Sequence, residues 1–139
     1  MTYWDSSCLV ALLVEETNTV ECESRLRSDP QIVTWWLSRI ECVSALNRLC
    51  RNGNLTESEL RVALKNLEIL SDSFVEVQPV AAVRLIAARL LRVHPLRAAD
   101  SLQLASAVLA AGENRKALEF LSYDTRLAEA ADREGFACL

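Results

Sequence analysis

The sequence has few of the residues that mark several common protein classes. It contains one histidine, three glycines and three prolines. No apolar run approaches the roughly 20 residues that a membrane-spanning helix needs. The start of the chain also lacks a basic segment followed by a signal-type apolar run and a cleavage site. Each glycine follows a stretch with helical periodicity, which leaves no glycine-rich loop to hold phosphate groups. We therefore expect a cytoplasmic protein that has no contact with a membrane.

The cysteines and the single histidine argue against zinc sites and disulfides. The cysteines are odd in number and include no Cys-x-x-Cys pair, so neither a disulfide framework nor a zinc site is expected. We expect all five to be small buried hydrophobic residues. His94 precedes Pro95 at the end of a predicted helix, which favours a capping or loop position. The cysteines are Cys8, Cys22, Cys42, Cys50 and Cys138.

The charge is mildly acidic, and the basic residues are mostly of one kind. The formal net charge of −4 argues against a nonspecific nucleic-acid-binding protein. Only Lys65 and Lys116 of the fifteen basic residues are lysines, which leaves thirteen arginines. Arginine suits bidentate contacts with phosphate or carboxylate groups. A bias toward arginine codons explains the same composition equally well.

Strand-like and helix-like segments alternate along the chain, as in an α/β protein with a mainly parallel sheet. The 139 residues are enough for one domain, over 1–139, with a substantial core. The predicted strands cover residues 2–5, 31–35, 74–77, 118–122 and 136–139. The predicted helices begin at Ser6, Thr17, Leu37, Thr56, Pro79, Leu96 and Thr125, and Thr56 opens a capping box.

One predicted helix, over residues 96–111, carries an acid on a face that should be apolar. Asp100 shares this face with Leu96, Leu104, Ala107 and Ala111 at helical spacing. An ionised carboxylate buried without a partner is strongly unfavourable or is forced to take up a proton. Asp100 is therefore exposed, hydrogen-bonded or held beside a cation, and the helix alone does not decide between these.

Three further acids lie where they can join Asp100. Asp5 and Asp124 each follow a predicted strand and precede a helix, and the carboxyl ends of parallel strands meet at one edge of a sheet. Glu41 lies among apolar residues in the helix over 37–52. Taken singly, Asp5 can be a helix N-cap and Glu41 a solvated side chain.

Together, the four carboxylates would repel one another unless protons, basic groups or a cation offset their charge. A site that contains only oxygen ligands suits Mg²⁺ or Mn²⁺. Such ions can activate water and bind a scissile phosphate, so this set of residues favours metal-assisted hydrolysis of a phosphodiester.

Four segments of the chain resemble the motifs of PIN-domain nucleases. They are Asp5-Ser6-Ser7 after the first strand, Ile40 to Leu46 around the glutamate, Leu96 to Ala107 around Asp100, and Phe120 to Ala131. The order, the spacing and the total length are similar to those of the small VapC-type toxins of toxin–antitoxin modules. The resemblance covers essentially the whole chain.

The resemblance implies a three-layer α/β/α fold with a central, mainly parallel sheet of four to five short strands. It also implies an endoribonuclease that depends on Mg²⁺ or Mn²⁺, forms a homodimer and is blocked by a cognate antitoxin. By this resemblance, Asp5 and Asp100 are the primary metal ligands, with Glu41 and Asp124 completing an acidic catalytic pocket. Ser6 and Ser122 would then orient the carboxylates or bound water, and the position of Arg97 suggests a contact with a substrate phosphate.

Three other interpretations remain open at this point. A PIN-domain nuclease of RNA processing would carry the same motifs without an antitoxin, and a PIN-like binding module would keep the fold without catalysis. A receiver module also gathers acids at a sheet edge, but it needs an acidic pair near the first strand and a lysine after a late strand. Here Asp5 stands alone, and Lys116 precedes the fourth strand.

Overall fold

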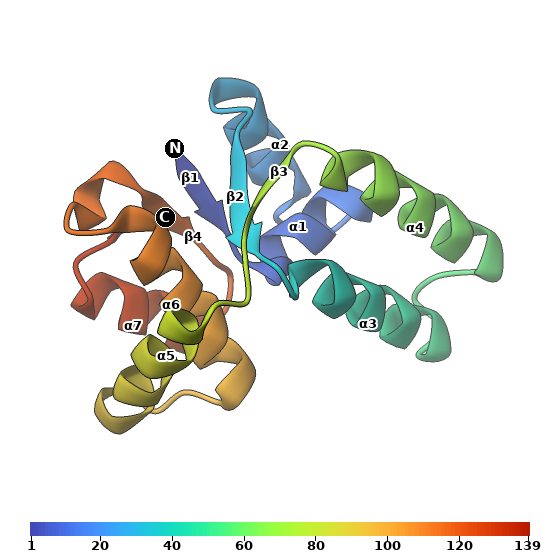
Figure 1. Ribbon diagram of the computed structural model, residues 1–139. Coiled ribbons are helices and arrows are strands. Elements are labelled where there is room, and N and C mark those ends of the chain that lie inside the picture. Colours follow the sequence, from blue (N-terminus) through green and yellow to red (C-terminus); the bar gives the residue numbers. More distant parts are fainter.

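The computed structural model describes residues 1–139 and contains one five-stranded sheet (Figure 1). The strands lie in the order β3-β2-β1-β4-β5, and every neighbouring pair is parallel. The predicted parallel sheet is confirmed, with some strands shorter than expected. The strands are β1 (Thr2–Trp4), β2 (Ile32–Trp35), β3 (Phe74–Val77), β4 (Glu119–Leu121) and β5 (Ala137–Cys138).

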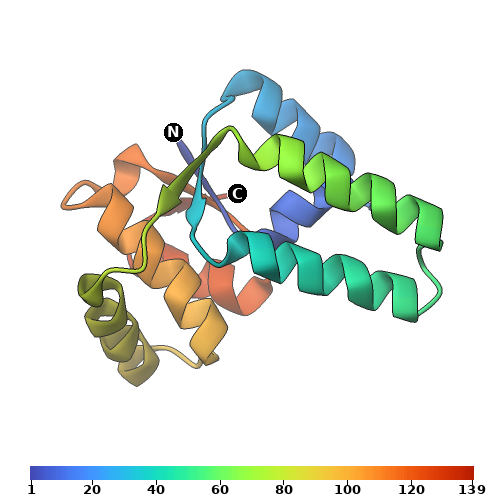
Figure 2. The same ribbon diagram turned by 45° about the vertical axis from the view of Figure 1, so that its right-hand side comes forward.

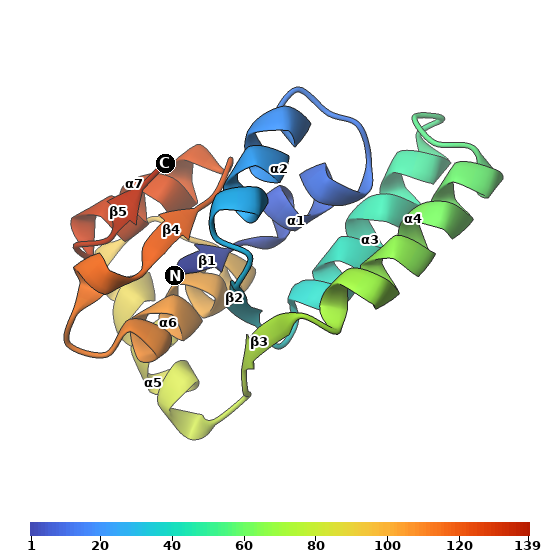
Figure 3. The ribbon, with the colours of Figure 1, turned by 90° about the horizontal axis from the view of Figure 1, so that it is seen from above.

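Seven helices cover the two faces of this sheet (Figure 3). The first four lie on one face and the last three on the other. None of them has the length and apolar character that crossing a membrane requires. The helices are α1 (Ser6–Leu13), α2 (Thr19–Ser28), α3 (Ser38–Arg51), α4 (Glu57–Ser71), α5 (Ala81–Val93), α6 (Ala98–Ala111) and α7 (Thr125–Arg133), with a short 3₁₀ helix at Arg115–Ala117.

Alternation along the strands separates the two layers of core, because successive side chains of a strand point to opposite faces. Tyr3 and Phe120 face the α5–α7 side, where their rings stack with centroids 5.1 Å apart. Trp4 and Leu121 face the α1–α4 side. Both faces of a parallel sheet must be covered by helices, so this division produces the three-layer α/β/α arrangement.

Several local predictions are corrected in detail. α2 begins at Thr19, and α5 begins at Ala81, two residues after Pro79. Two apolar residues of this region, Val80 and Leu91, are 48% and 44% exposed. Val80 precedes the first turn of α5, and Leu91 lies beside buried Leu90 on the outer side of that helix. The capping box at Thr56 is confirmed, with side-chain bonds in both directions between Thr56 and Glu59.

The cysteines are all free, as expected, but they are not all buried. Cys8, Cys22 and Cys42 are fully enclosed, whereas Cys50 and Cys138 are half-buried. His94 is the C-cap residue of α5 and is buried, and its Nε2 lies 2.8 Å from Oε1 of Glu134 at the end of α7.

The carboxyl end of the sheet is where the acidic motifs meet. β1 is the central strand, and only Asp5 separates it from α1. α3 and α6 belong to opposite helical layers and run away from this region on different sides (Figure 2). The carboxyl ends of β1 and β4 therefore lie between the two helical layers.

Candidate functional site

Asp5 is the most enclosed of the predicted acids. It follows β1 and caps α1, where its Oδ1 accepts a hydrogen bond of 2.8 Å from the Ser7 backbone N–H. Its Oδ2 accepts bonds from the hydroxyls of Ser7, at 2.9 Å, and Ser122. The side chain is only 4% exposed. Burial raises the pKa of Asp5, and the hydroxyl and amide donors oppose that rise by stabilising the ionised form.

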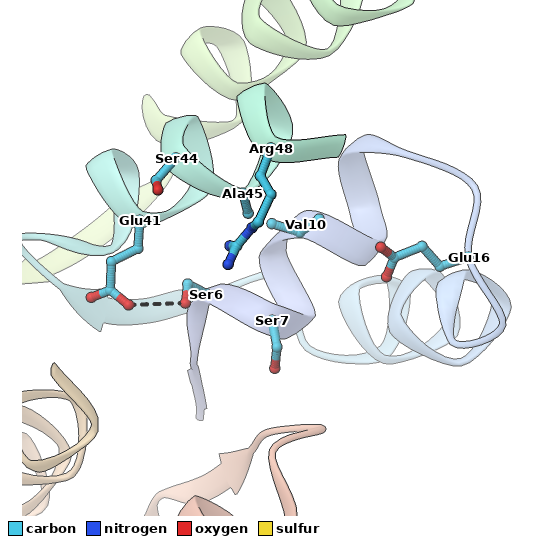
Figure 4. Close-up of a pocket in the computed structure, with 8 residues that line it drawn as sticks. All are labelled: Ser6, Ser7, Val10, Glu16, Glu41, Ser44, Ala45 and Arg48. Carbon is cyan, nitrogen blue, oxygen red and sulfur yellow. Dashed lines mark hydrogen bonds between the residues drawn. The ribbon is translucent and has the colours of Figure 1, made fainter. Parts of the chain in front are cut away.

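Glu41 is connected to Asp5 through a serine. The Ser6 hydroxyl lies 3.2 Å from Oδ1 of Asp5 and 3.1 Å from Oε2 of Glu41 (Figure 4). The other Glu41 oxygen accepts a 3.2 Å bond from the Gln103 amide. Burial raises the pKa of Glu41, and the nearby negative charges of Asp5 and Asp100 add to the effect. Asp5 and Glu41 therefore belong to one hydrogen-bonded group.

Asp100 lies in the first turn of α6 and is half-buried, at the rim of the core. Its neighbours on the predicted apolar face, Leu104 and Ala107, are fully buried one and two turns further on. Burial raises the pKa of Asp100, followed by the charge of Asp124, and the charge of Asp5 adds a smaller contribution. Asp100 and Asp124 also line the same depression at the surface.

Asp124 is exposed and caps α7, where its Oδ1 accepts a 3.0 Å bond from the Leu127 N–H. The pairing of Trp4 with Leu121 brings the ends of β1 and β4 together. Ser122 follows β4 and connects the two acids, since its hydroxyl donates to Asp5 and accepts a 3.1 Å bond from the Asp124 N–H. Parallel pairing therefore brings the two strand-end acids to the same edge of the sheet.

Two depressions border these acids. One, of about 380 Å³, is lined by Ser6, Ser7 and Glu41 (Figure 4). The other, of about 710 Å³, is lined by Asp100 and Asp124. Arg97, predicted to contact substrate, lines this second depression, together with Arg48 and Arg126. Arg48 also lines the first.

The donor set fits a hard divalent cation in chemistry, because every candidate ligand is a carboxylate or hydroxyl oxygen. The raised pKa values of Asp5, Glu41 and Asp100 show that negative charge is disfavoured there, and a cation would offset that charge. The side chains are nevertheless spread around the site, and no three acidic, histidine or cysteine side chains converge closely enough to enclose one ion.

The sequence did not single out the polar network beneath the acids. The Gln103 amide donates to Ser38, at 2.9 Å, and its Oε1 accepts a 2.6 Å bond from the Tyr3 hydroxyl. Ser38 in turn accepts a 2.7 Å bond from Thr34. All four side chains are buried. The available signal was Gln103 itself, one turn beyond Asp100 in an otherwise apolar stretch.

The fold and the four motifs define a family. The model of the PIN domain matches residues 2–133, and the chain belongs to the PIN-domain family. It is also similar to two curated proteins of Mycobacterium tuberculosis: Ribonuclease VapC45 of strain CDC 1551 / Oshkosh and Ribonuclease VapC49 of strain ATCC 25618 / H37Rv. Each is 34% identical over 135 residues, which cover 97% of this chain and 92% of the relative.

Two solved structures share the fold. The crystal structure of FitAcB from Neisseria gonorrhoeae matches with a TM-score of 0.69 and 18% identity, covering all of this chain and 96% of that one. The crystal structure of PAE2754 from Pyrobaculum aerophilum matches with a TM-score of 0.65 and 19% identity, covering 99% and 82%. These likenesses confirm the predicted α/β fold.

Proposed function

We propose that this protein is a metal-dependent endoribonuclease and the toxin of a toxin–antitoxin pair. The observation that carries the proposal is that Asp5, Glu41, Asp100 and Asp124 all border one edge of a PIN-domain sheet, although no three of them enclose a single ion position. The similarity to proteins named ribonuclease VapC supports RNA as the substrate. All four acids of the predicted set are retained, which favours catalysis over a binding-only role.

In this proposal, Asp5 and Asp100 hold Mg²⁺ or Mn²⁺, and Glu41 and Asp124 complete the acidic pocket. A bound divalent ion supplies a Lewis acid for the scissile phosphate and ionises water near neutral pH. The hydrogen bonds around Asp5 and Glu41 oppose the effect of burial and orient the two carboxylates for that task. Ser122 and Ser7 donate to Asp5, and each such bond favours the anion that a cation requires.

Ser6 and Gln103 have the same role toward Glu41. They donate to its two oxygens and so fix the orientation of the carboxylate. Arg97 lies beside Asp100 in the larger depression, and its guanidinium is suited to a phosphate of the RNA backbone. Substrate would therefore enter from the side of Asp100 and Asp124, which is the more exposed part of the site.

The remaining assignments follow from the same family. We propose a homodimer in the cytoplasm, where its RNA substrate is found, and a cognate antitoxin that blocks the acidic pocket. An antitoxin would also distinguish a toxin from an RNA-processing nuclease. Its expected signature is growth arrest when this chain is produced alone, and relief when the product of an adjacent small gene is produced with it.

Incubation with total RNA tests the activity. The parent protein should cleave RNA with Mg²⁺ or Mn²⁺ and stop when EDTA is added, and sequencing of the new ends would identify the target. Asp5→Asn and Asp100→Asn should remain folded and lose cleavage. Cleavage that continues in EDTA, or in both variants, would refute the assignment.

A further inference from the structure

Arg48 occupies a position that the acidic motifs do not explain. It lines both depressions, the one beside Ser6 and Glu41 and the one beside Asp100 and Asp124. Figure 4 shows its side chain extending from α3 toward the start of α1. The two depressions therefore share one basic side chain at their border.

The position of Arg48 on α3 sets its distance from the acids. It is seven residues after Glu41, which places both on one face of the helix, separated by roughly 10 Å along the axis. Ser44 and Ala45 line the same depression between them (Figure 4). Arg48 is thus close enough to contact the same polymer as Glu41.

Two more arginines border the larger depression from other elements. Arg97 precedes α6, and Arg126 lies in the first turn of α7. All three arginines are exposed, and none forms an ion pair, even though two aspartates line the same depression. Their charges are therefore available to a ligand.

The balance of charge in this depression differs from that of the chain. Three arginines and two aspartates line it, whereas the whole chain has a net charge of −4. Arginine binds phosphate through a planar, bidentate set of donors. A row of such groups beside a carboxylate site suits a polyanion whose scissile bond lies at the acids.

We propose that Arg48, Arg97 and Arg126 form a phosphate-binding track for single-stranded RNA. Arg48 holds a backbone phosphate away from the scissile bond, where the two depressions join. This inference rests on the proposed ribonuclease function and adds how an acidic protein binds its RNA. Phosphate contacts position the strand and carry no sequence information by themselves.

The track predicts a specific pattern of kinetic change. Arg48→Ala should raise KM several-fold and leave kcat nearly unchanged, because the lost contact is the same in the ground state and the transition state. Each lost phosphate contact should reduce the salt dependence of log K by about 0.7 for single-stranded RNA. Arg48→Lys should recover part of the affinity, since it keeps the charge without the bidentate geometry.

The test compares Arg48→Ala, Arg126→Ala and Arg48→Lys with a control, Arg61→Ala. Arg61 is also exposed and helical, but it lies on α4 and borders neither depression. The probe is a fluorescein-labelled, mixed-sequence, 20-nucleotide RNA. Its anisotropy is measured between 50 and 200 mM salt with Ca²⁺ in place of Mg²⁺, and cleavage of total RNA with Mg²⁺ is followed in parallel.

The inference holds if the Arg48→Ala and Arg126→Ala variants bind the probe several-fold more weakly with a smaller salt slope, while Arg61→Ala matches the parent. It is overturned, with the ribonuclease function intact, if the parent cleaves RNA and all three alanine variants behave alike. A parent that neither binds nor cleaves RNA would refute the proposed function together with the track. Melting curves check folding, and none of the substituted side chains forms an ion pair that its loss would break.

Discussion

The two halves of the acidic site are built differently. Asp5 and Glu41 are held by serine hydroxyls and by Gln103, and Asp5 is almost completely enclosed. Asp100 and Asp124 border an open depression among arginines, and the carboxylate of Asp124 is engaged in capping α7. One half is held by hydrogen bonds from protein neighbours, and the other half is more open, with Asp124 exposed and Asp100 half-buried.

This difference indicates how a folded protein can contain a cluster of acids and still bind a polyanion beside it. Burial disfavours the ionised form of a carboxylate, and the serine donors offset part of that cost for Asp5 and Glu41. Exposed carboxylates need fewer such donors, because water solvates them, and their surroundings can carry arginines for the substrate. We expect changes in the enclosed half to disturb both stability and catalysis, and changes in the open half to act mainly on charge and substrate binding.

The largest effect should come from Asp5→Asn in the enclosed half. The substitution keeps the shape of the side chain but removes a candidate metal ligand. Cleavage of RNA should fall by at least about 100-fold, which exceeds the 10–100-fold cost typical of groups that only orient ligands. Initial rates with Mg²⁺ measure it, and Asp132→Asn, an exposed residue of α7, provides the control. Equal rates for the two variants would contradict the role of Asp5.

A smaller effect is expected from Ser122→Ala. Its loss removes one hydrogen bond to Asp5 and leaves the Asp124 N–H without its partner. Activity should fall about 10–100-fold, and the apparent affinity for Mg²⁺ should weaken with it. The control is Thr125→Ala in the open half of the site. Thr125 is exposed, and its substitution should change activity little. Measuring activity at increasing Mg²⁺ concentration distinguishes the two variants. A stronger effect of Thr125→Ala than of Ser122→Ala would contradict the prediction.

Gln103→Leu tests whether the polar network supports the enclosed half. It leaves buried Tyr3 and Ser38 without their amide partner. Unfolding in urea should show a loss of about 1–3 kcal/mol, the usual cost of buried groups left unsatisfied. Gln31→Leu, at an exposed position, should stay within about 0.5 kcal/mol. A loss of less than about 0.5 kcal/mol for Gln103→Leu would show that the network does not stabilise the fold.

The smallest effect concerns the stability of the metal-free protein at Asp100. The pKa of this residue is raised by burial and by Asp124, so the folded state binds its proton more tightly than the unfolded chain. Stability from this group is then fully present below the ordinary aspartate pKa and is lost as pH rises through the raised value. In EDTA near neutral pH, Asp100→Asn should therefore have a higher melting temperature than the parent. The gain in the free energy of unfolding should be less than about 1 kcal/mol, because solvent screens the site.

The check on this last prediction is its pH dependence. The gap in melting temperature between Asp100→Asn and the parent should shrink toward pH 4 and widen toward pH 7. A parent more stable than Asp100→Asn at pH 7 without metal would show that the carboxylate has a structural role instead.

The positions of Asp5 and Asp124 could be predicted from the sequence because they follow from a general rule. An acid that follows a strand and precedes a helix lies at the carboxyl edge of the sheet. Parallel pairing of two such strands brings their carboxyl ends side by side. Asp5 and Asp124 therefore meet through the pairing of Trp4 with Leu121. The resemblance to PIN-domain motifs added Glu41 and Asp100, which spacing alone left ambiguous.

The supporting residues could not be predicted in the same way. Whether Gln103 reaches Glu41 depends on how α6 packs beside α3, and residues 62 positions apart carry no local signal of that contact. Arg48 looked like any other exposed arginine of a helix. Its place between two depressions is a property of the surface, which forms only when the helical layers are assembled.

The bond between Asp5 and Ser122 has a consequence for the timing of folding. Its two residues are 117 positions apart, and β1 has β4 as one of its two neighbours in the sheet. On the ribosome, where a chain emerges from its N-terminus, β1 cannot complete its pairing until residues 119–121 have been made. Unfinished chains thus lack the hydroxyl that holds Asp5, and the capacity to cut RNA should arise only near the end of synthesis.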